Sequence, residues 1–106
     1  MRKFLVLAAL LGSALIAPAA HADPVTHVVD IRDFAYKPDS LTIAVGDTVK
    51  FVNHDDVGHT VTAKDASFDS KNLDTGKSWS YTFTTAGTYP YLCTVHPSMQ
   101  ATITAQ

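Results

Sequence analysis

The sequence has 106 residues, enough for one domain and too few for two separate hydrophobic cores. Hydrophobic residues make up 46% of the chain, so it can bury a core, whereas charged residues make up only 17%. The formal net charge is −2, and no cluster of Lys and Arg offers the basic face that a nucleic-acid binder needs. Nucleic-acid binding is therefore excluded as a function class.

The first 22 residues have the pattern of a secretory signal peptide. Arg2 and Lys3 form the charged start, residues 4–16 are mostly apolar, and Ala20-His21-Ala22 is a small-x-small cleavage site. The apolar run of about thirteen residues is shorter than the roughly twenty that span a bilayer. We therefore expect the leader to be cleaved, the protein to reach the periplasm, and residues 23–106 to form one domain without a membrane span.

Short stretches of alternating apolar and polar residues recur along this domain at 25–31, 41–45, 49–53, 79–83 and 101–104. Turn residues separate them, and frequent Thr and Val favour strands. Residues 63–78 are polar and irregular, and we expect a long loop there with one short strand near Phe68. We predict an all-β fold, a single Greek-key β-sandwich of seven to eight short strands, with Trp79, Tyr81 and Phe83 facing its core.

Cys93 is the single cysteine of the sequence. Exported proteins meet an oxidising compartment, where cysteines normally pair. A lone cysteine in such a protein indicates an intermolecular disulfide, a reactive thiol or a metal ligand. The residues that follow Cys93 decide between these roles.

The segment from Cys93 to Met99 places a thiolate, an imidazole and a thioether at positions i, i+3 and i+6, with His96 in the middle. Thiolate and thioether select soft ions such as Cu(I), whereas zinc takes Cys, His, Asp and Glu and rarely Met. One thiolate, two imidazoles and a distant axial Met form a blue-copper electron-transfer site. The segment therefore lacks one imidazole.

Three other histidines of residues 23–106 could supply that imidazole. His59 begins a β-branched run after an Asp-rich loop, and the start of a strand would fix its backbone at the end of the sandwich. His54 lies inside the polar turn, and His27 shares a strand face with apolar Val29. We predict His59 as the ligand, His54 as exposed to solvent and His27 as a residue of the sandwich rim.

These segments resemble those of the small blue copper proteins, the cupredoxins, and within them the amicyanin and plastocyanin branch. Residues 41–53 are similar to the strand before the first His loop, His59-Thr60-Val61 to the first ligand segment, and residues 81–99 to the strand and loop with the other ligands. The Cys-x-x-His-x-x-Met spacing looks like that of amicyanin. The resemblance implies one type 1 copper ion with His59, Cys93, His96 and a weak axial Met99 as ligands.

The sequence departs from this branch at two positions beside the predicted ligands. Thr60 stands where the branch often has Asn, and its hydroxyl could still tie two loops together. Val95 stands where amicyanin usually has Pro, so it keeps an N–H that could donate to the thiolate. Such a bond would raise the reduction potential.

The resemblance implies an exported electron carrier rather than an enzyme. A protein that delivers or stores Cu(I) in the cell envelope is the main alternative, because it could use the same ligands with more labile coordination. An enzyme with Cys93 as nucleophile and His96 as base is disfavoured, since no acidic residue in this loop orients the imidazole. A purely structural role, with Cys93 and Met99 filling the core, is the third interpretation.

We expect His96 to lie at the surface with Pro97 and Ser98, where transient redox partners would dock. Without the leader, six Lys and Arg face ten Asp, which gives a net charge of −4. This surplus of negative charge would attract a basic partner. The protein is expected to act as a monomer.

Overall fold

Eight β-strands make up the regular structure of residues 23–106, the part of the chain that the computed structural model describes. In chain order they are β1 (Thr26–Arg32), β2 (Ala35–Lys37), β3 (Ser40–Ile43), β4 (Thr48–Asn53), β5 (Thr62–Ala63), β6 (Ser78–Thr82), β7 (Gly87–Leu92) and β8 (Gln100–Ala105). Within this range no helix has the length and hydropathy that a membrane crossing requires. The predicted leader, residues 1–22, lies outside the described residues.

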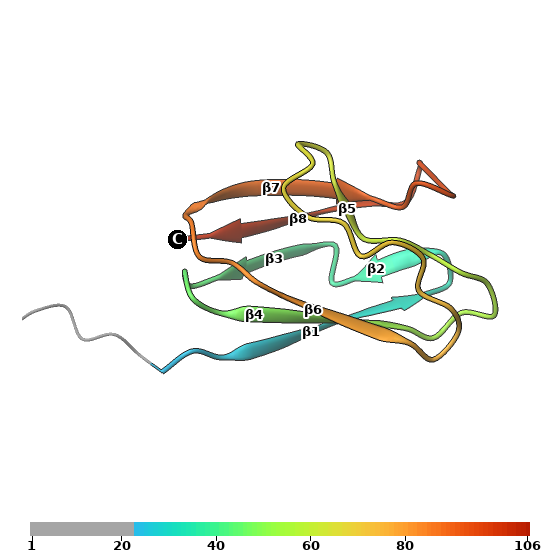
Figure 1. Cartoon of the computed structure of the whole chain (residues 1–106), viewed down its shortest axis with the longest axis horizontal. Coiled ribbons are helices and arrows are strands. Elements are labelled where there is room, and N and C mark those ends of the chain that lie inside the picture. Colours follow the sequence, from blue (N-terminus) through green and yellow to red (C-terminus); the bar gives the residue numbers. More distant parts are fainter. Residues whose placement is uncertain (1–22) are drawn as a thin grey trace, which may run out of the picture.

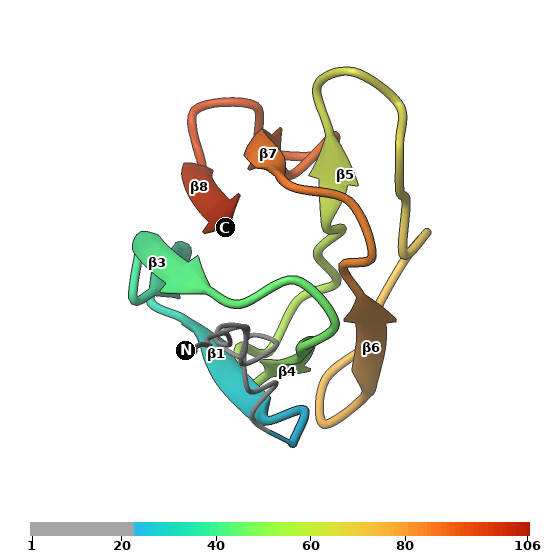
Figure 2. The ribbon, with the colours of Figure 1, turned by 90° about the vertical axis from the view of Figure 1, so that its left-hand side faces the viewer.

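The strands form two sheets that pack face to face (Figure 1). One sheet has the order β2-β1-β4-β6, and the other has the order β3-β8-β7-β5. β1 pairs with β4 and β3 with β8 in parallel, and all other neighbours are antiparallel. Viewed from one end, the strands surround a common interior (Figure 2). The predicted all-β sandwich and its number of strands are confirmed.

Period-two alternation explains which side chains fill this interior, because successive residues of a strand point to opposite faces. In β4, Val49 and Phe51 are fully buried, while Lys50 between them is exposed. In β8, Ile103 is fully buried and Ala101 nearly so. The alternating stretches of the sequence therefore became strands with the expected apolar face inward.

The three aromatic residues predicted to face the core differ in burial. Phe83 is buried, whereas Trp79 and Tyr81 are only partly buried and pack against the core from β6. β6 is an edge strand, so its side chains have a neighbouring strand on one side only. Tyr36 and Tyr91 are larger contributors to the fully buried core than the sequence indicated.

The long loop between β5 and β6 is present, but the short strand predicted near Phe68 is not formed in it. Phe68 is buried, and its ring lies 4.9 Å from Tyr81 and 5.5 Å from Phe83 between centroids. Next to it, Thr62 pairs with Asp69 in an isolated bridge, and the Ala63 N–H donates to the Phe68 carbonyl at 2.9 Å, so both ring packing and short backbone pairing hold this part of the loop. Further along, Leu73 pairs with His59 in an isolated bridge, so the loop also contacts a predicted ligand.

Candidate metal centre

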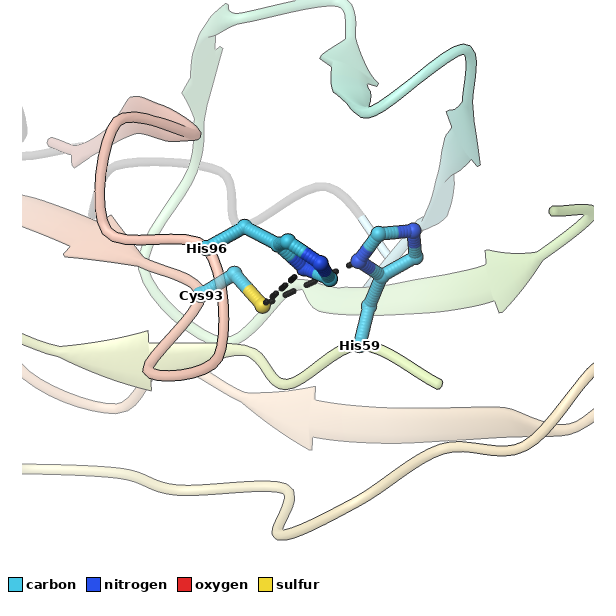
Figure 3. A group of neighbouring side chains, drawn as sticks. All are labelled: His59, Cys93 and His96. Atoms are coloured by element: carbon cyan, nitrogen blue, oxygen red, sulfur yellow. Dashed lines mark hydrogen bonds between the residues drawn. The ribbon is translucent and has the colours of Figure 1, made fainter. Parts of the chain in front are cut away.

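Three predicted ligands meet at the end of the sandwich where β4 and β7 finish. Cys93 Sγ lies 3.7 Å from Nδ1 of His59 and 3.7 Å from Nδ1 of His96. All three donor atoms lie within 4.8 Å of one another. No other group of three or more His, Cys, Asp or Glu residues in 23–106 comes together in this way. Figure 3 shows the two imidazoles and the thiol turned toward one another.

The spacing of these donor atoms fits a single metal ion. Metal–sulfur bonds of about 2.3 Å and metal–nitrogen bonds of about 2.0 Å in a trigonal plane hold sulfur and nitrogen about 3.7 Å apart. The structure shows the same separation, 3.7 Å from the sulfur to each nitrogen. A thiolate with two imidazoles, and a thioether on the same loop, is the donor set that copper takes in blue-copper sites.

The loop from Cys93 to Met99 is closed by its own backbone. The Cys93 N–H donates to the Met99 carbonyl at 3.1 Å, and the Met99 N–H donates to the His96 carbonyl at 2.8 Å. This tight turn brings the His96 ring back toward Cys93. Cys93 and Met99 are buried and His96 is partly buried. The structure therefore brings three of the four predicted ligands together and places Met99 inside the protein on the same short loop.

The backbone of His59 is held by the long loop rather than by a strand. The His59 N–H donates to the Leu73 carbonyl at 3.1 Å, and the Leu73 N–H donates back at 2.7 Å. Fully buried Asn53 donates from Nδ2 to the carbonyls of Val57 and Leu73, both at 2.8 Å. The strand predicted to begin at His59 begins only at Thr62, because the preceding backbone pairs with this loop.

Asp55 contacts the other side of the His59 ring, a contact that sequence reasoning missed. The Asp55 Oδ2 atom lies 2.8 Å from His59 Nε2, while the N–H groups of Asp33 and Phe34 donate to the two carboxylate oxygens at 2.7 and 2.9 Å. Burial raises the pKa of Asp55, but the hydrogen bonds from Phe34, His59 and Asp33 outweigh it and hold that pKa below its usual value.

The geometry of this contact indicates which nitrogen of a neutral His59 ring carries the proton. An ionised carboxylate only accepts hydrogen bonds, so Nε2 of His59 must be the donor to Asp55. Nδ1 then carries a free lone pair, and it is the atom that faces Cys93 Sγ. The arrangement matches the carboxylate–histidine pairs that orient metal-binding imidazoles in proteins. The four-residue spacing between Asp55 and His59 was the one sequence signal for this contact.

Thr60 joins the two predicted ligand loops, a role that the sequence analysis left open for its hydroxyl. Its hydroxyl accepts a hydrogen bond from the Thr94 N–H at 2.9 Å, and its own N–H lies 3.4 Å from Cys93 Sγ. The sequence analysis named the Val95 N–H as a possible donor to the sulfur, but in the structure the backbone donor is the Thr60 N–H. Val95 lies on the outer part of the loop with its side chain 58% exposed.

The other two histidines of residues 23–106 lie away from the three donors. His54 is exposed, and its Nε2 pairs with Asp30 at 2.8 Å. His27 is partly buried near the start of β1, and its Nε2 pairs with Asp47 at 2.8 Å. The predictions of an exposed His54 and a rim position for His27 are confirmed.

The fold and the donor set together define a class: a small β-sandwich protein with one blue-copper centre. Comparison with known proteins agrees. The family model for the cupredoxin-like domain matches residues 3–105, and the chain belongs to the cupredoxin family, with copper as its cofactor.

Individual relatives support the predicted resemblance to amicyanin and plastocyanin. Amicyanin of Paracoccus denitrificans is 34% identical over 84 residues, which cover 74% of this chain and 64% of that protein. Plastocyanin of Scenedesmus fuscus is 36% identical over 90 residues, covering 73% of this chain and 92% of that protein. A Cu(I) structure of an amicyanin variant superposes with a TM-score of 0.72 at 32% identity, covering 76% of this chain and 82% of that one.

Proposed function

We propose that this protein is a type 1 copper electron carrier whose ion is held by His59, Cys93 and His96, with Met99 as the weak axial ligand. The observation that carries the proposal is the convergence of one thiol and two imidazole Nδ1 atoms, each nitrogen 3.7 Å from the sulfur. The family membership and the buried position of Met99 support the same ligand set.

The protein residues around the ion would keep its ligands in one arrangement during electron transfer. Bound copper supplies a one-electron couple between Cu(II) and Cu(I). The two ligand loops are tied to each other through Thr60 and Thr94, and the His59 ring is held by Asp55. Because these contacts do not depend on the metal, the donors need to move little between the two oxidation states. Cys93 follows directly on β7, so its sulfur links the centre to that strand.

A redox partner would dock at the end of the sandwich where His96 is partly exposed. Exposed apolar side chains occur on the three loops at this end, with exposed fractions of 50% for Phe34, 41% for Val57 and 58% for Val95. Redox encounters use small interfaces, for which such a rim is sufficient. We propose a transient basic partner, attracted by the surplus of Asp, and a carrier that acts as a monomer.

A catalytic role for the cysteine is the alternative that the geometry makes worth testing. Cys93, His59 and Asp55 stand in the order of a nucleophile, a base and a residue that orients the base. However, Cys93 is fully buried, and a second imidazole lies at the same distance from its sulfur. A substrate has no access to such a thiol, so we propose an electron carrier rather than an enzyme.

We further propose that the protein works in the periplasm as the domain 23–106, after removal of the leader 1–22. The leader pattern of the sequence supports export. A lone cysteine that is buried suits an oxidising compartment, because it is withdrawn from intermolecular disulfides.

Visible absorption of the copper-loaded protein tests this function. We expect an intense copper–thiolate band that ascorbate bleaches and an oxidant restores, and we expect its loss in Cys93→Ser. A pale wild-type protein would contradict the electron carrier. Rapid transfer of copper from the reduced wild-type protein to a Cu(I) chelator would instead favour Cu(I) delivery, because delivery requires labile coordination.

A further inference from the structure

The turn between β1 and β2 has an unfavourable backbone for its residues. Asp33 and Phe34 connect the paired residues Arg32 and Ala35, and both have a φ of 55°. Two-residue hairpin turns with positive φ at both positions prefer Asn and Gly, whereas a bulky residue rarely adopts this conformation. Strain of this kind often accompanies a functional requirement for the side chain, here the ring of Phe34.

The Phe34 ring contacts both predicted imidazole ligands. Its centroid lies 5.1 Å from the His59 ring and 4.9 Å from the His96 ring, edge to face in both cases. Phe34 is 50% exposed, so its ring lies between the imidazoles and solvent. The two imidazoles are themselves 5.0 Å apart, which is why one aromatic ring can touch both.

The carboxylate of Asp55 holds this turn in place. Its Oδ1 accepts the Asp33 N–H at 2.7 Å, and its Oδ2 accepts the Phe34 N–H at 2.9 Å. The same Oδ2 atom accepts Nε2–H of His59 at 2.8 Å. One side chain therefore fixes a ligand ring and stabilises the strained turn that carries the aromatic cover.

The two imidazoles are restrained very differently. His59 is fully buried, with Asp55 on its outer nitrogen. His96 is partly exposed on a short loop, and among the contacts of residues 23–106 its ring has no carboxylate partner. Its ring contacts are with Phe34 and His59. His96 is thus the proposed ligand most able to swing away, and the half-exposed Phe34 packs directly against its ring.

We propose that Asp55 and Phe34 form a clamp over the copper centre, in which Asp55 positions His59 and the β1–β2 turn, and the Phe34 ring restrains His96 and slows the release of copper. Both are positioning residues, since neither supplies a donor atom to the ion. This inference rests on the proposed copper centre and adds to it what limits exchange of the metal.

The ring is tested by Phe34→Gly with Asp33→Gly as its matched control. Glycine relieves the positive φ in both variants, so neither should lose stability through the backbone. We expect transfer of Cu(I) from the reduced protein to excess bathocuproine disulfonate to become about two- to tenfold faster in Phe34→Gly, the range that one aromatic contact is worth. Asp33→Gly should match wild type, and Phe34→Tyr should restore slow release.

The carboxylate is tested by Asp55→Asn with Asp47→Asn as control, since Asp47 also accepts two backbone N–H groups and one His ring. An amide has one acceptor oxygen and cannot satisfy all three donors. We expect copper affinity to fall about 10- to 100-fold in Asp55→Asn, as for other residues that orient metal ligands, and to stay unchanged in Asp47→Asn. In the metal-free protein, nitrogen-detected NMR should show a smaller share of the Nε2-protonated tautomer of His59 in Asp55→Asn, because the amide can also turn its NH2 group toward Nε2.

These experiments separate the clamp from the copper centre itself. A wild-type protein without intense copper–thiolate absorption would overturn the proposed function. If the wild-type protein is blue but Phe34→Gly releases copper no faster than Asp33→Gly, the proposed restraint of His96 by Phe34 is overturned, while the copper centre stands. Unchanged copper affinity and an unchanged His59 tautomer in Asp55→Asn would overturn the positioning role of Asp55.

Discussion

Two carboxylates, Asp47 just before β4 and Asp55 just beyond it, are bound in the same way at opposite ends of that strand. Asp47 accepts the N–H of Val25 at 2.9 Å, the N–H of Ala44 at 3.1 Å, and Nε2 of His27 at 2.8 Å. Asp55 likewise accepts two backbone N–H groups and one histidine Nε2. Each carboxylate thus joins distant segments and orients one imidazole.

The two ends differ in the groups that lie around the other nitrogen, Nδ1, of each imidazole. Nδ1 of His59 lies 3.7 Å from Cys93 Sγ, and the His59 ring is fully buried. The side chain of His27 is 26% exposed, and no group of metal-binding residues in the described chain includes it. A carboxylate can therefore orient a histidine at either end, but only His59 has a soft donor beside its other nitrogen, as the proposed copper centre requires.

Replacing each histidine by Ala tests the difference between the two ends most directly, and of the changes considered it should alter the copper spectrum most. His59→Ala should abolish the intense visible absorption of the copper-loaded protein, since one of the two imidazole donors is lost. His27→Ala should leave that absorption unchanged, because His27 contributes only to the hydrogen bonds of Asp47. Absorption spectra recorded at equal copper loading give the answer.

Either of two outcomes would contradict this view of the two ends. A blue His59→Ala protein would mean that another residue supplies the second imidazole. A colourless His27→Ala protein with normal far-ultraviolet circular dichroism would mean that the end bearing Asp47 is coupled to the copper centre. A His54→Ala variant serves as a further control, because His54 pairs with Asp30 at the surface.

The hydrogen bond from the Thr94 N–H to the Thr60 hydroxyl should stabilise the end of the sandwich that bears the proposed ligands. In Thr60→Ala the Thr94 N–H loses its acceptor, and an unsatisfied backbone donor costs about 1–3 kcal/mol when it is buried. Because Thr94 lies near the surface, we expect the lower end of this range. Urea unfolding of the metal-free protein measures the loss, and Thr60→Ser, which keeps the hydroxyl, should recover most of it.

The fold and the grouping of one thiol with two imidazoles were predictable because most of their sequence signals are local. Alternation over five or six residues is sufficient to define β4 and its buried Phe51. The spacing of Cys93, His96 and Met99 within seven residues specifies a soft metal site whatever the rest of the fold. The choice of His59 needed only its position at the end of a polar loop.

The contacts that were not predictable join segments far apart in the sequence. Asp55 accepts N–H groups about twenty residues earlier, from a hairpin turn that lacks the usual Gly or Asn. Nothing local in the sequence places Phe34 on the two imidazoles, and nothing local pairs Leu73 with His59. Near Phe68 the backbone forms only an isolated bridge between Thr62 and Asp69 instead of the expected strand, and the Phe68 ring packs against rings that are more than ten residues away in the sequence.

At the end of the sandwich that bears Asp47, the free energy of unfolding should depend weakly on pH. Hydrogen bonds from His27 and from the Val25 N–H lower the pKa of Asp47 below its usual value, against the opposing effect of burial. A carboxyl whose pKa is lower in the folded state contributes stability that is present above its unfolded pKa and is lost as the pH falls through the folded pKa. The contribution should therefore be fully present at neutral pH and fade as the pH falls below the usual pKa of an Asp carboxyl.

Asp47→Asn makes this contribution measurable, because Asn cannot titrate. In urea unfolding of the metal-free proteins, wild type should exceed Asp47→Asn in unfolding free energy at neutral pH, and the difference should shrink as the pH falls through the acidic range. A constant difference would show that Asp47 acts through shape alone and not through its charge. The copper spectrum of Asp47→Asn should match wild type at neutral pH, because the three metal donors lie beyond the other end of β4. A shifted spectrum would mean that the two carboxylates do not act independently.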